Sequence, residues 1–346
     1  MIHKSYSSLL ILSLLWAVVA CTAHKQTHSP TVKVITTTGD RSKEFKADTL
    51  ALFSADKTTN ANITLKPTEK FQTVYGFGAA ITGSTCYNLM QMSPADRKNF
   101  LIQTFSETEG FGQNFVRISI GCSDFSLSEY TLCDTKGIEH FALTQEETKY
   151  VIPILKEILA INPKVQIIGS PWTPPRWMKV NNLTDLQPYN HWTSGQLNPA
   201  LYQDYALYFA KWLQAMKDNG LNVNAITIQN EPLNRGNSAS MYMGWDEQLA
   251  FIKKALGKTL RDKGFAEVKI YLFDHNYNYD NMPSQQQYPL HIYKDTEASQ
   301  YITGAAYHNY GGNPDELNNI HNQYPNKELI FTESSIGTWN LSLIHI

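Results

Sequence analysis

The feature that most constrains the fold is a repeated alternation of short apolar segments with longer amphipathic segments from Phe71 onward. The apolar segments are rich in β-branched residues, which is typical of buried strands. The longer segments place apolar residues three or four positions apart, which is typical of helices. The predicted strands are 74–81, 115–120, 165–170, 226–229, 269–273, 302–307 and 329–332. This alternation predicts an α/β fold with a parallel sheet.

Helix start and stop signals fit the same scheme. The predicted starts lie at Ser93, Thr144, Asn198 and Asp246, and the predicted ends at Gly220 and Gly264. Each start residue has a side chain that can accept a hydrogen bond from the first helical turn. Glycine takes the left-handed backbone conformation that often ends a helix.

Polar residues follow nearly every predicted strand. They are Ser123-Asp124, Trp172-Thr173, Asn230-Glu231, Asp274-His275, His308-Asn309-Tyr310 and Glu333-Ser334. Functional groups at the carboxyl ends of the strands are typical of a (β/α)₈ TIM barrel. A doubly wound sheet is the alternative, but no Gly-x-Gly-x-x-Gly loop follows the first strand. We therefore predict a barrel over residues 68–339, truncated after about strand seven.

Two of these strand ends carry a glutamate. Glu231 follows the apolar run 225–228, and Pro232 stops that strand beside it. Glu333 follows the run 328–332. Paired carboxylates can cleave a glycosidic bond, one as a proton donor and one as an ion at the anomeric carbon. The pair indicates a glycosidase, although either residue alone would suit a solvated strand end.

Composition narrows the class of ligand. The 346 residues carry a net charge of −2, so no basic surplus indicates a nucleic acid partner. The 7 Trp and 19 Tyr suit a carbohydrate site, although most of them are expected in the core. The 10 His are scattered without metal-ligand spacing, so no metal site is predicted.

The N-terminus reads as a targeting segment. Residues 1–20 combine Lys4 with an apolar core over 9–20, as in a signal peptide. The motif Val18-Val19-Ala20-Cys21 resembles a bacterial lipobox, which predicts lipidation of Cys21, a tether over 21–31 and anchoring in the periplasm or at the outer membrane or cell surface. An ordinary secretory signal is the alternative.

Lipidation of Cys21 would leave three cysteines, Cys86, Cys122 and Cys133. An odd number cannot all pair, and a Cys122–Cys133 bridge is one option. Between the tether and the barrel, residues 32–67 show two or three short strand patterns, with Val32 in the first and with Ile63 and Leu65 in the last.

Several motifs in one order resemble the glucosylceramidase-type enzymes of glycoside hydrolase family 30, from about residue 65 to 339. They are Lys70 to Gly78, Cys122 to Ser126, Ser170 to Lys179, Asn230-Glu231-Pro232 and Phe331 to Ser334. The resemblance implies that Glu231 is the general acid/base and Glu333 the nucleophile. It also implies substrate-binding or supporting roles for Asn230, Asp124, Trp172, Arg117, His308 and Tyr310.

Each supporting residue has a plainer interpretation. Arg117 could be a buried ion-pair partner, and His308 a structural histidine at a strand end. Tyr310 and Trp172 could be aromatics at the rim of the barrel.

The resemblance implies a retaining β-glycosidase that needs no cofactor or metal. Its expected substrate is a carbohydrate or glycolipid, either glucosylceramide or β-1,6-glucan, with xylan less favoured. The membrane would be reached only through the lipid anchor, and the oligomeric state stays open. A non-catalytic surface glycan-binding protein is the alternative from another class.

One departure concerns the C-terminal end. The family continues through an eighth strand and a β-sandwich that would pair with residues 32–67. Residues 341–346 instead resemble a translated library-preparation sequence, which predicts a non-native tail. A barrel left open in this way is expected to fold poorly or to be an inactive fragment.

Overall fold

The computed structural model describes residues 30–52, 63–277 and 282–335. It divides into two compact units, residues 1–72 with 336–346 and residues 73–335. The signal peptide, the lipidation site Cys21 and the tail 341–346 lie outside the described residues, so these expectations stay predictions. Within the described part of the chain, no helix is both long and apolar enough to cross a membrane.

The first unit contains one antiparallel hairpin. Its strands are β1 (Thr31–Thr36) and β2 (Lys46–Ala51), paired from Thr31 with Ala51 to Thr36 with Lys46. The third strand considered at Ile63 and Leu65 is not formed: both side chains are more than three-quarters exposed. An alternating apolar pattern becomes a strand only where a partner strand is available, and the described residues offer none here.

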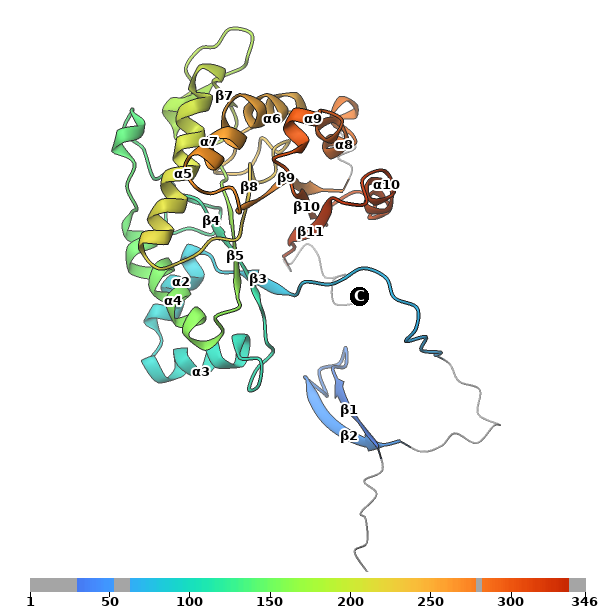
Figure 1. Ribbon diagram of the computed structural model, residues 1–346. Coiled ribbons are helices and arrows are strands. Elements are labelled where there is room, and N and C mark those ends of the chain that lie inside the picture. Colours follow the sequence, from blue (N-terminus) through green and yellow to red (C-terminus); the bar gives the residue numbers. More distant parts are fainter. Residues whose placement is uncertain (1–29, 53–62, 278–281, 336–346) are drawn as a thin grey trace, which may run out of the picture. The chain divides into compact units, whose positions relative to one another are not determined.

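The second unit is built on a seven-stranded sheet (Figure 1). Its strands are β3 (Gly78–Ala80), β4 (Phe115–Ser119), β5 (Gln166–Ser170), β8 (Ala225–Thr227), β9 (Lys269–Asn276), β10 (Gly304–His308) and β11 (Glu328–Glu333). All neighbouring pairs are parallel, and the strands stand in chain order from β3 to β11. In a doubly wound sheet, the order of the strands would reverse near the middle of the sheet. The sheet is therefore an open TIM barrel, as predicted, with β3 and β11 as its edges.

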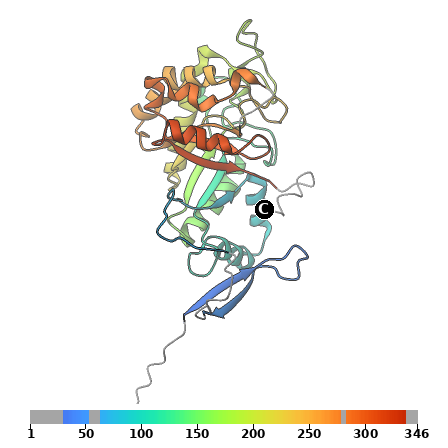
Figure 2. The ribbon, with the colours of Figure 1, turned by 90° about the vertical axis from the view of Figure 1, so that its right-hand side faces the viewer.

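Helices connect the strands and cover the outer side of the sheet (Figures 1 and 2). They are α2 (Gly83–Gln91), α3 (Pro94–Phe105), α4 (Ile152–Ile161), α5 (Tyr202–Asp218), α6 (Trp245–Phe251), α7 (Gly257–Asp262), α8 (Tyr288–Tyr293), α9 (Thr296–Ser299) and α10 (Asp315–Gln323). Two short strands, β6 (Lys179–Val180) and β7 (Gln196–Leu197), form a separate ribbon in the connection before α5.

The helix starts follow the capping chemistry read from the sequence. Ser93 Oγ accepts from the Asp96 backbone N–H at 3.1 Å, and Asn198 accepts from Ala200 at 3.0 Å. At Thr144 the cap is formed by the Glu147 carboxylate, which accepts from the Thr144 N–H at 2.8 Å. The start predicted at Asp246 is shifted, because helix α6 begins one residue earlier behind Gly244.

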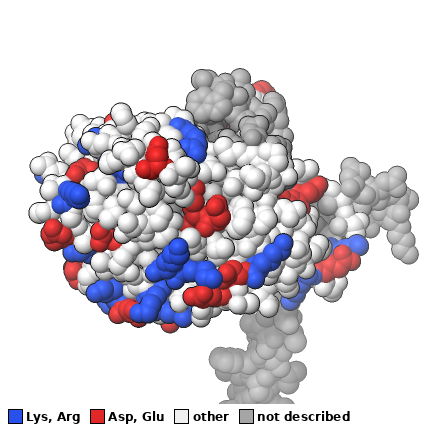
Figure 3. Space-filling model, turned by 90° about the horizontal axis from the view of Figure 1, so that it is seen from above, with Lys and Arg blue, Asp and Glu red and all other residues white. Residues whose placement is uncertain are grey.

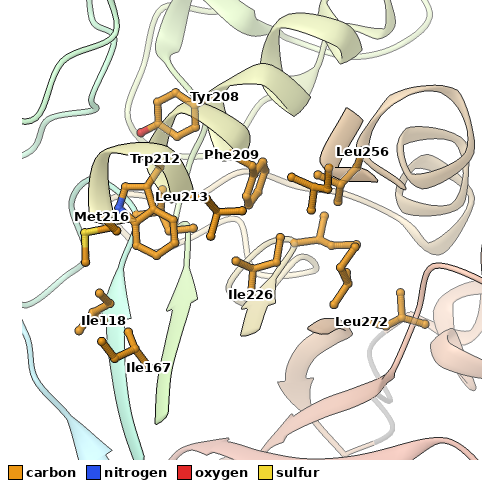
Figure 4. Packing of buried hydrophobic residues seen from close by; sticks show 14 of the residues in the cluster. Ile118, Ile167, Tyr208, Phe209, Trp212, Leu213, Met216, Ile226, Leu256 and Leu272 are labelled. Carbon is orange, nitrogen blue, oxygen red and sulfur yellow. The ribbon is translucent and has the colours of Figure 1, made fainter. Parts of the chain in front are cut away.

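The core lies between α5 and the sheet (Figure 4). Trp212 from α5 points toward Ile118 and Ile167 on β4 and β5 in that view. Gly169 on β5 makes room for the indole: a Cβ there would lie 2.3 Å from Trp212 Cη2. The aromatics of α5 are thus core residues, as their helical spacing predicts.

Truncation of this indole should be costly. Trp212 is 1% exposed, and Trp212→Ala should lower the free energy of unfolding by about 3–5 kcal/mol, because transfer and cavity terms add. Urea denaturation followed by circular dichroism measures the change. Lys217→Ala on the exposed side of the same helix is the matched control, and it should shift stability by less than about 0.5 kcal/mol. Equal shifts for the two variants would contradict the packing argument.

Cys86, Cys122 and Cys133 are buried free thiols. The Cys122–Cys133 bridge considered above is not formed, and Cys133 Sγ instead donates to the Gly137 carbonyl at 3.1 Å. Burial raises the pKa of the Cys122 thiol to about 11, so it stays protonated at neutral pH.

Candidate active site

Both glutamates lie at the carboxyl edge of the sheet. Glu333 is the last residue of β11, and Glu231 follows β8 by four positions. The backbone of Glu231 has φ of +43° and donates its N–H to the Asp274 carbonyl at 2.9 Å. A left-handed glutamate is uncommon, and such strain concentrates at functional sites.

Glu333 is bound by a cation and a phenol. Arg117 Nη1 donates to Glu333 Oε2 at 2.8 Å, and Tyr310 Oη donates to Oε1 at 3.2 Å. Burial and the Glu333 charge raise the pKa of Tyr310 to about 12, so the phenol remains a neutral donor. The guanidinium is a charged hydrogen-bond donor to the Glu333 carboxylate, the group expected to act as the nucleophile.

Glu231 has a different set of partners. His308 Nδ1 lies 3.2 Å from Glu231 Oε1, and Asn234 Nδ2 donates to Oε2 at 2.7 Å. Burial alone would raise the pKa of Glu231, but the hydrogen bonds from His308 and Asn234 and the charges of His275 and His308 together outweigh it and lower that pKa to about 2. In the free protein Glu231 is therefore ionised, whereas the first step of the expected mechanism needs it protonated.

The proton that Glu231 lacks is bound to His308, which contacts Glu231 directly. Burial would lower the pKa of this histidine, but hydrogen bonds to Asp274 and Glu231 raise it to about 9. Glu231 and His308 thus share one proton, which lies on the imidazole at neutral pH.

Arg117 and His308 make the buried structural contacts expected of them and also contact the two candidate catalytic glutamates. Arg117 is 6% exposed and forms a buried ion pair with Asp274, with Nη2 to Oδ2 at 2.8 Å, while it also binds Glu333. His308 is fully buried at the end of β10 and contacts Glu231 directly. Each is structural and part of the site at once.

The other predicted residues surround these groups. Asn230 Oδ1 accepts from Arg117 Nη2 at 2.8 Å, and the Trp172 ring centroid lies 4.8 Å from Arg117 Cζ. Trp172 is 6% exposed, so it is not a rim residue. Asp124 lies exposed on the loop after β4, where partial burial of its carboxyl and the charge of Glu333 raise its pKa. Their contacts with a sugar remain predictions.

Sequence reasoning missed several members of the site. Asp274 was noted only as a polar strand end, yet it accepts hydrogen bonds from Ser170, Thr227 and Thr332 besides Arg117 and His308. Asn234 was not singled out at all. Its position three residues after Glu231, in a turn closed by the Asn234 N–H and the Glu231 carbonyl, is the only local signal.

Glu231, His275 and His308 also bring potential metal-ligand atoms within 4.8 Å of one another. Histidine must be neutral to bind a metal ion. The raised pKa of His308 favours the imidazolium, whose nitrogens both face carboxylates. The geometry therefore favours hydrogen bonding at His308 over metal binding, since both of its ring nitrogens already lie against carboxylate oxygens.

Comparisons with known proteins give the family of this chain. The Glycosyl hydrolase family 30 TIM-barrel domain matches residues 74–343. The lysosomal acid glucosylceramidase of Mus musculus is 30% identical over 304 residues, 82% of this chain and 56% of that protein. An endo-1,6-beta-D-glucanase of Neurospora crassa is 33% identical over 275 residues, 77% of this chain and 54% of that protein.

Among solved structures, the endo-beta1,6-glucanase BT3312 is 60% identical, with a TM-score of 0.84, and the match covers 89% of this chain and 66% of that one. The chain spans about half the length of the two curated relatives. The matched domain extends over more than three-quarters of the chain, from before β3 to beyond β11. The chain therefore belongs to glycosyl hydrolase family 30.

Proposed function

We propose that this protein is a retaining β-glycosidase that cleaves β-1,6-linked glucan. The observation that carries the proposal is the unequal environment of two carboxylates at one edge of the barrel. Glu333 is held by Arg117 and Tyr310, whereas Glu231 is held by His308 and Asn234. Two acids with opposite tasks need such unequal surroundings.

In the first step Glu333 Oε attacks the anomeric carbon, and the bond to the leaving oxygen breaks as that oxygen takes a proton from Glu231. Because Glu231 is ionised in the free protein, its proton is supplied by His308 when the substrate displaces water. In the second step Glu231 takes a proton from water, and the hydroxide replaces Glu333 on the sugar. Configuration is retained, and the two carboxyl groups are expected about 5–5.5 Å apart.

The substrate assignment follows the relatives. The 60% identical structure is that of an endo-beta1,6-glucanase, whereas the glucosylceramidase is 30% identical. On the face of the molecule seen in Figure 3, Lys and Arg residues intermingle with Asp and Glu residues among a majority of other residues. Glucosylceramide is the second candidate, favoured by its own named relative.

The test offers four substrates to the full chain: β-1,6-glucan, β-1,3-glucan, xylan and glucosylceramide in detergent. We expect new reducing ends from β-1,6-glucan alone. ¹H NMR should show that the first product formed is the β-anomer. Faster release of ceramide would replace the substrate assignment. Binding of β-1,6-glucan by calorimetry without any hydrolysis would favour the glycan-binding alternative, and release of α-anomers would overturn the retaining mechanism.

A further inference from the structure

Asp274 is a buried charge that the proposed mechanism does not yet use. The residue is 0% exposed in the middle of the site, and its carboxyl oxygens accept five hydrogen bonds. The donors come from five strands: Arg117 on β4, Ser170 next on β5, Thr227 on β8, His308 on β10 and Thr332 on β11. Burying an ionised carboxylate is costly in free energy. The five hydrogen bonds to the Asp274 carboxylate therefore indicate a role that needs its charge.

The donors divide between the two oxygens. Oδ2 accepts from Arg117 at 2.8 Å, from Thr227 at 2.6 Å and from Ser170 at 3.2 Å, whereas Oδ1 accepts from His308 Nε2 at 3.0 Å and from Thr332 at 2.6 Å. Arg117 also donates a hydrogen bond to Glu333, and His308 also forms a hydrogen bond with Glu231. Asp274 is therefore one cation away from each glutamate, on opposite oxygens.

The backbone is deformed to place this side chain. In the pairing of β9 with β10, Phe273 is opposite Ala306 and His275 is opposite Tyr307, so Asp274 is an extra residue. It has φ of +61°. Thr332 is likewise extra between β10 and β11, because Phe331 and Glu333 are opposite successive residues. Bulges re-aim side chains next to active sites, and these two bulged residues bond to each other.

We propose that Asp274 is a positioning residue for both steps: through Oδ2 it holds Arg117 against Glu333, and through Oδ1 it holds His308 as the proton store of Glu231. The inference rests on the proposed function for the roles of the two glutamates. Three carboxylates and two cations alternate along one chain of contacts, Glu333, Arg117, Asp274, His308 and Glu231. Removing the central charge disturbs both ends.

Asp274→Asn tests this arrangement with nearly unchanged shape. The new amide is neutral, so it no longer stabilises an imidazolium at His308 Nε2, and the histidine should lose its proton near or below its ordinary pKa. In the wild type, the raised pKa of His308, about 9, keeps this side chain protonated at neutral pH. The imidazolium loses its proton only as the pH rises above that value. Imidazole ¹⁵N NMR of the full chain, assigned with His308→Gln, follows this titration directly.

The kinetic expectation is specific as well. For Asp274→Asn, kcat on β-1,6-glucan should fall on the order of 10²-fold or more, with a smaller loss on an aryl glucoside whose leaving group needs little protonation. The matched control is Asp295→Asn, whose carboxylate pairs with Lys253 on the surface, and it should change neither readout. Thermal melting confirms that each variant folds.

The outcomes separate the claims. An inactive wild type on every glucan overturns the proposed function but leaves the His308 titration as a complete test of Asp274. Loss of activity with an unchanged His308 titration means that Asp274 is merely structural. If Asp274→Asn does not fold, the wild-type spectrum decides, because a neutral His308 at pH 7 overturns the proposal.

Discussion

Glu333→Gln should reduce kcat on the order of 10⁴-fold or more, because the amide cannot form the covalent glycosyl intermediate. The substitution keeps the shape of the side chain and a carbonyl oxygen for Arg117 Nη1, which lies at 2.8 Å from the carboxylate. Binding of the glucan should therefore survive. Initial rates on β-1,6-glucan and calorimetric binding measure the two effects separately.

The same strand provides the control. Glu328 lies at the opposite end of β11, where it pairs with Lys269 at 2.8 Å and accepts a hydrogen bond from Tyr271. Glu328→Gln should leave kcat within a few-fold of wild type, although stability can fall. A fluoro-glycoside should label Glu333 in the wild type, and mass spectrometry identifies the residue. Labelling of another carboxylate, or full activity of Glu333→Gln, would refute the assignment.

The order of the fold was readable from the sequence because strand and helix patterns have different periods. The run at 329–332 lies inside β11, and the run at 115–120 matches β4 to within one residue. Chain order of the strands follows from parallel pairing with short helical connections. Within the described residues, this order leaves β3 and β11 as the two edges of the sheet.

Local irregularities were not readable, because no propensity encodes them. The first strand was expected over 74–81, but only Gly78–Ala80 pairs with β4, and Phe77 stays largely exposed. The bulges at Asp274 and Thr332 depend on neighbouring strands that sequence periodicity does not reveal. These bulges are nevertheless what brings the site together.

The positions of Glu231 and Glu333 were predicted, but the charge state of Glu231 was not. A carboxylate in a buried site is expected to resist ionisation, and burial does act in that direction here. The contacts with His308, His275 and Asn234 together reverse the result, and the one with His308 joins residues 77 positions apart. Only the folded arrangement shows which effect wins.

Glu231→Ala should separate the two steps of the reaction. Without the proton donor, hydrolysis of β-1,6-glucan should slow by about 10²–10⁴-fold, whereas a dinitrophenyl glucoside should still form the glycosyl intermediate at a comparable rate. The intermediate then accumulates, because no base activates water. Steady-state rates on both substrates, with a burst of dinitrophenol in stopped flow, measure the difference.

Azide tests the second step of the same variant. Small and already anionic, it can enter the space left by the Glu231 side chain and attack the intermediate without a base. We expect a glucosyl azide of β configuration and a several-fold faster steady state. Glu297→Ala, which removes a surface carboxylate beside Lys253, is the control. It should keep the wild-type rates on both substrates, and azide should not accelerate it. Equal losses on both glucosides, without rescue, would assign the proton donor to another residue. His308 would be the first to examine, since in the free protein it carries the proton that Glu231 lacks.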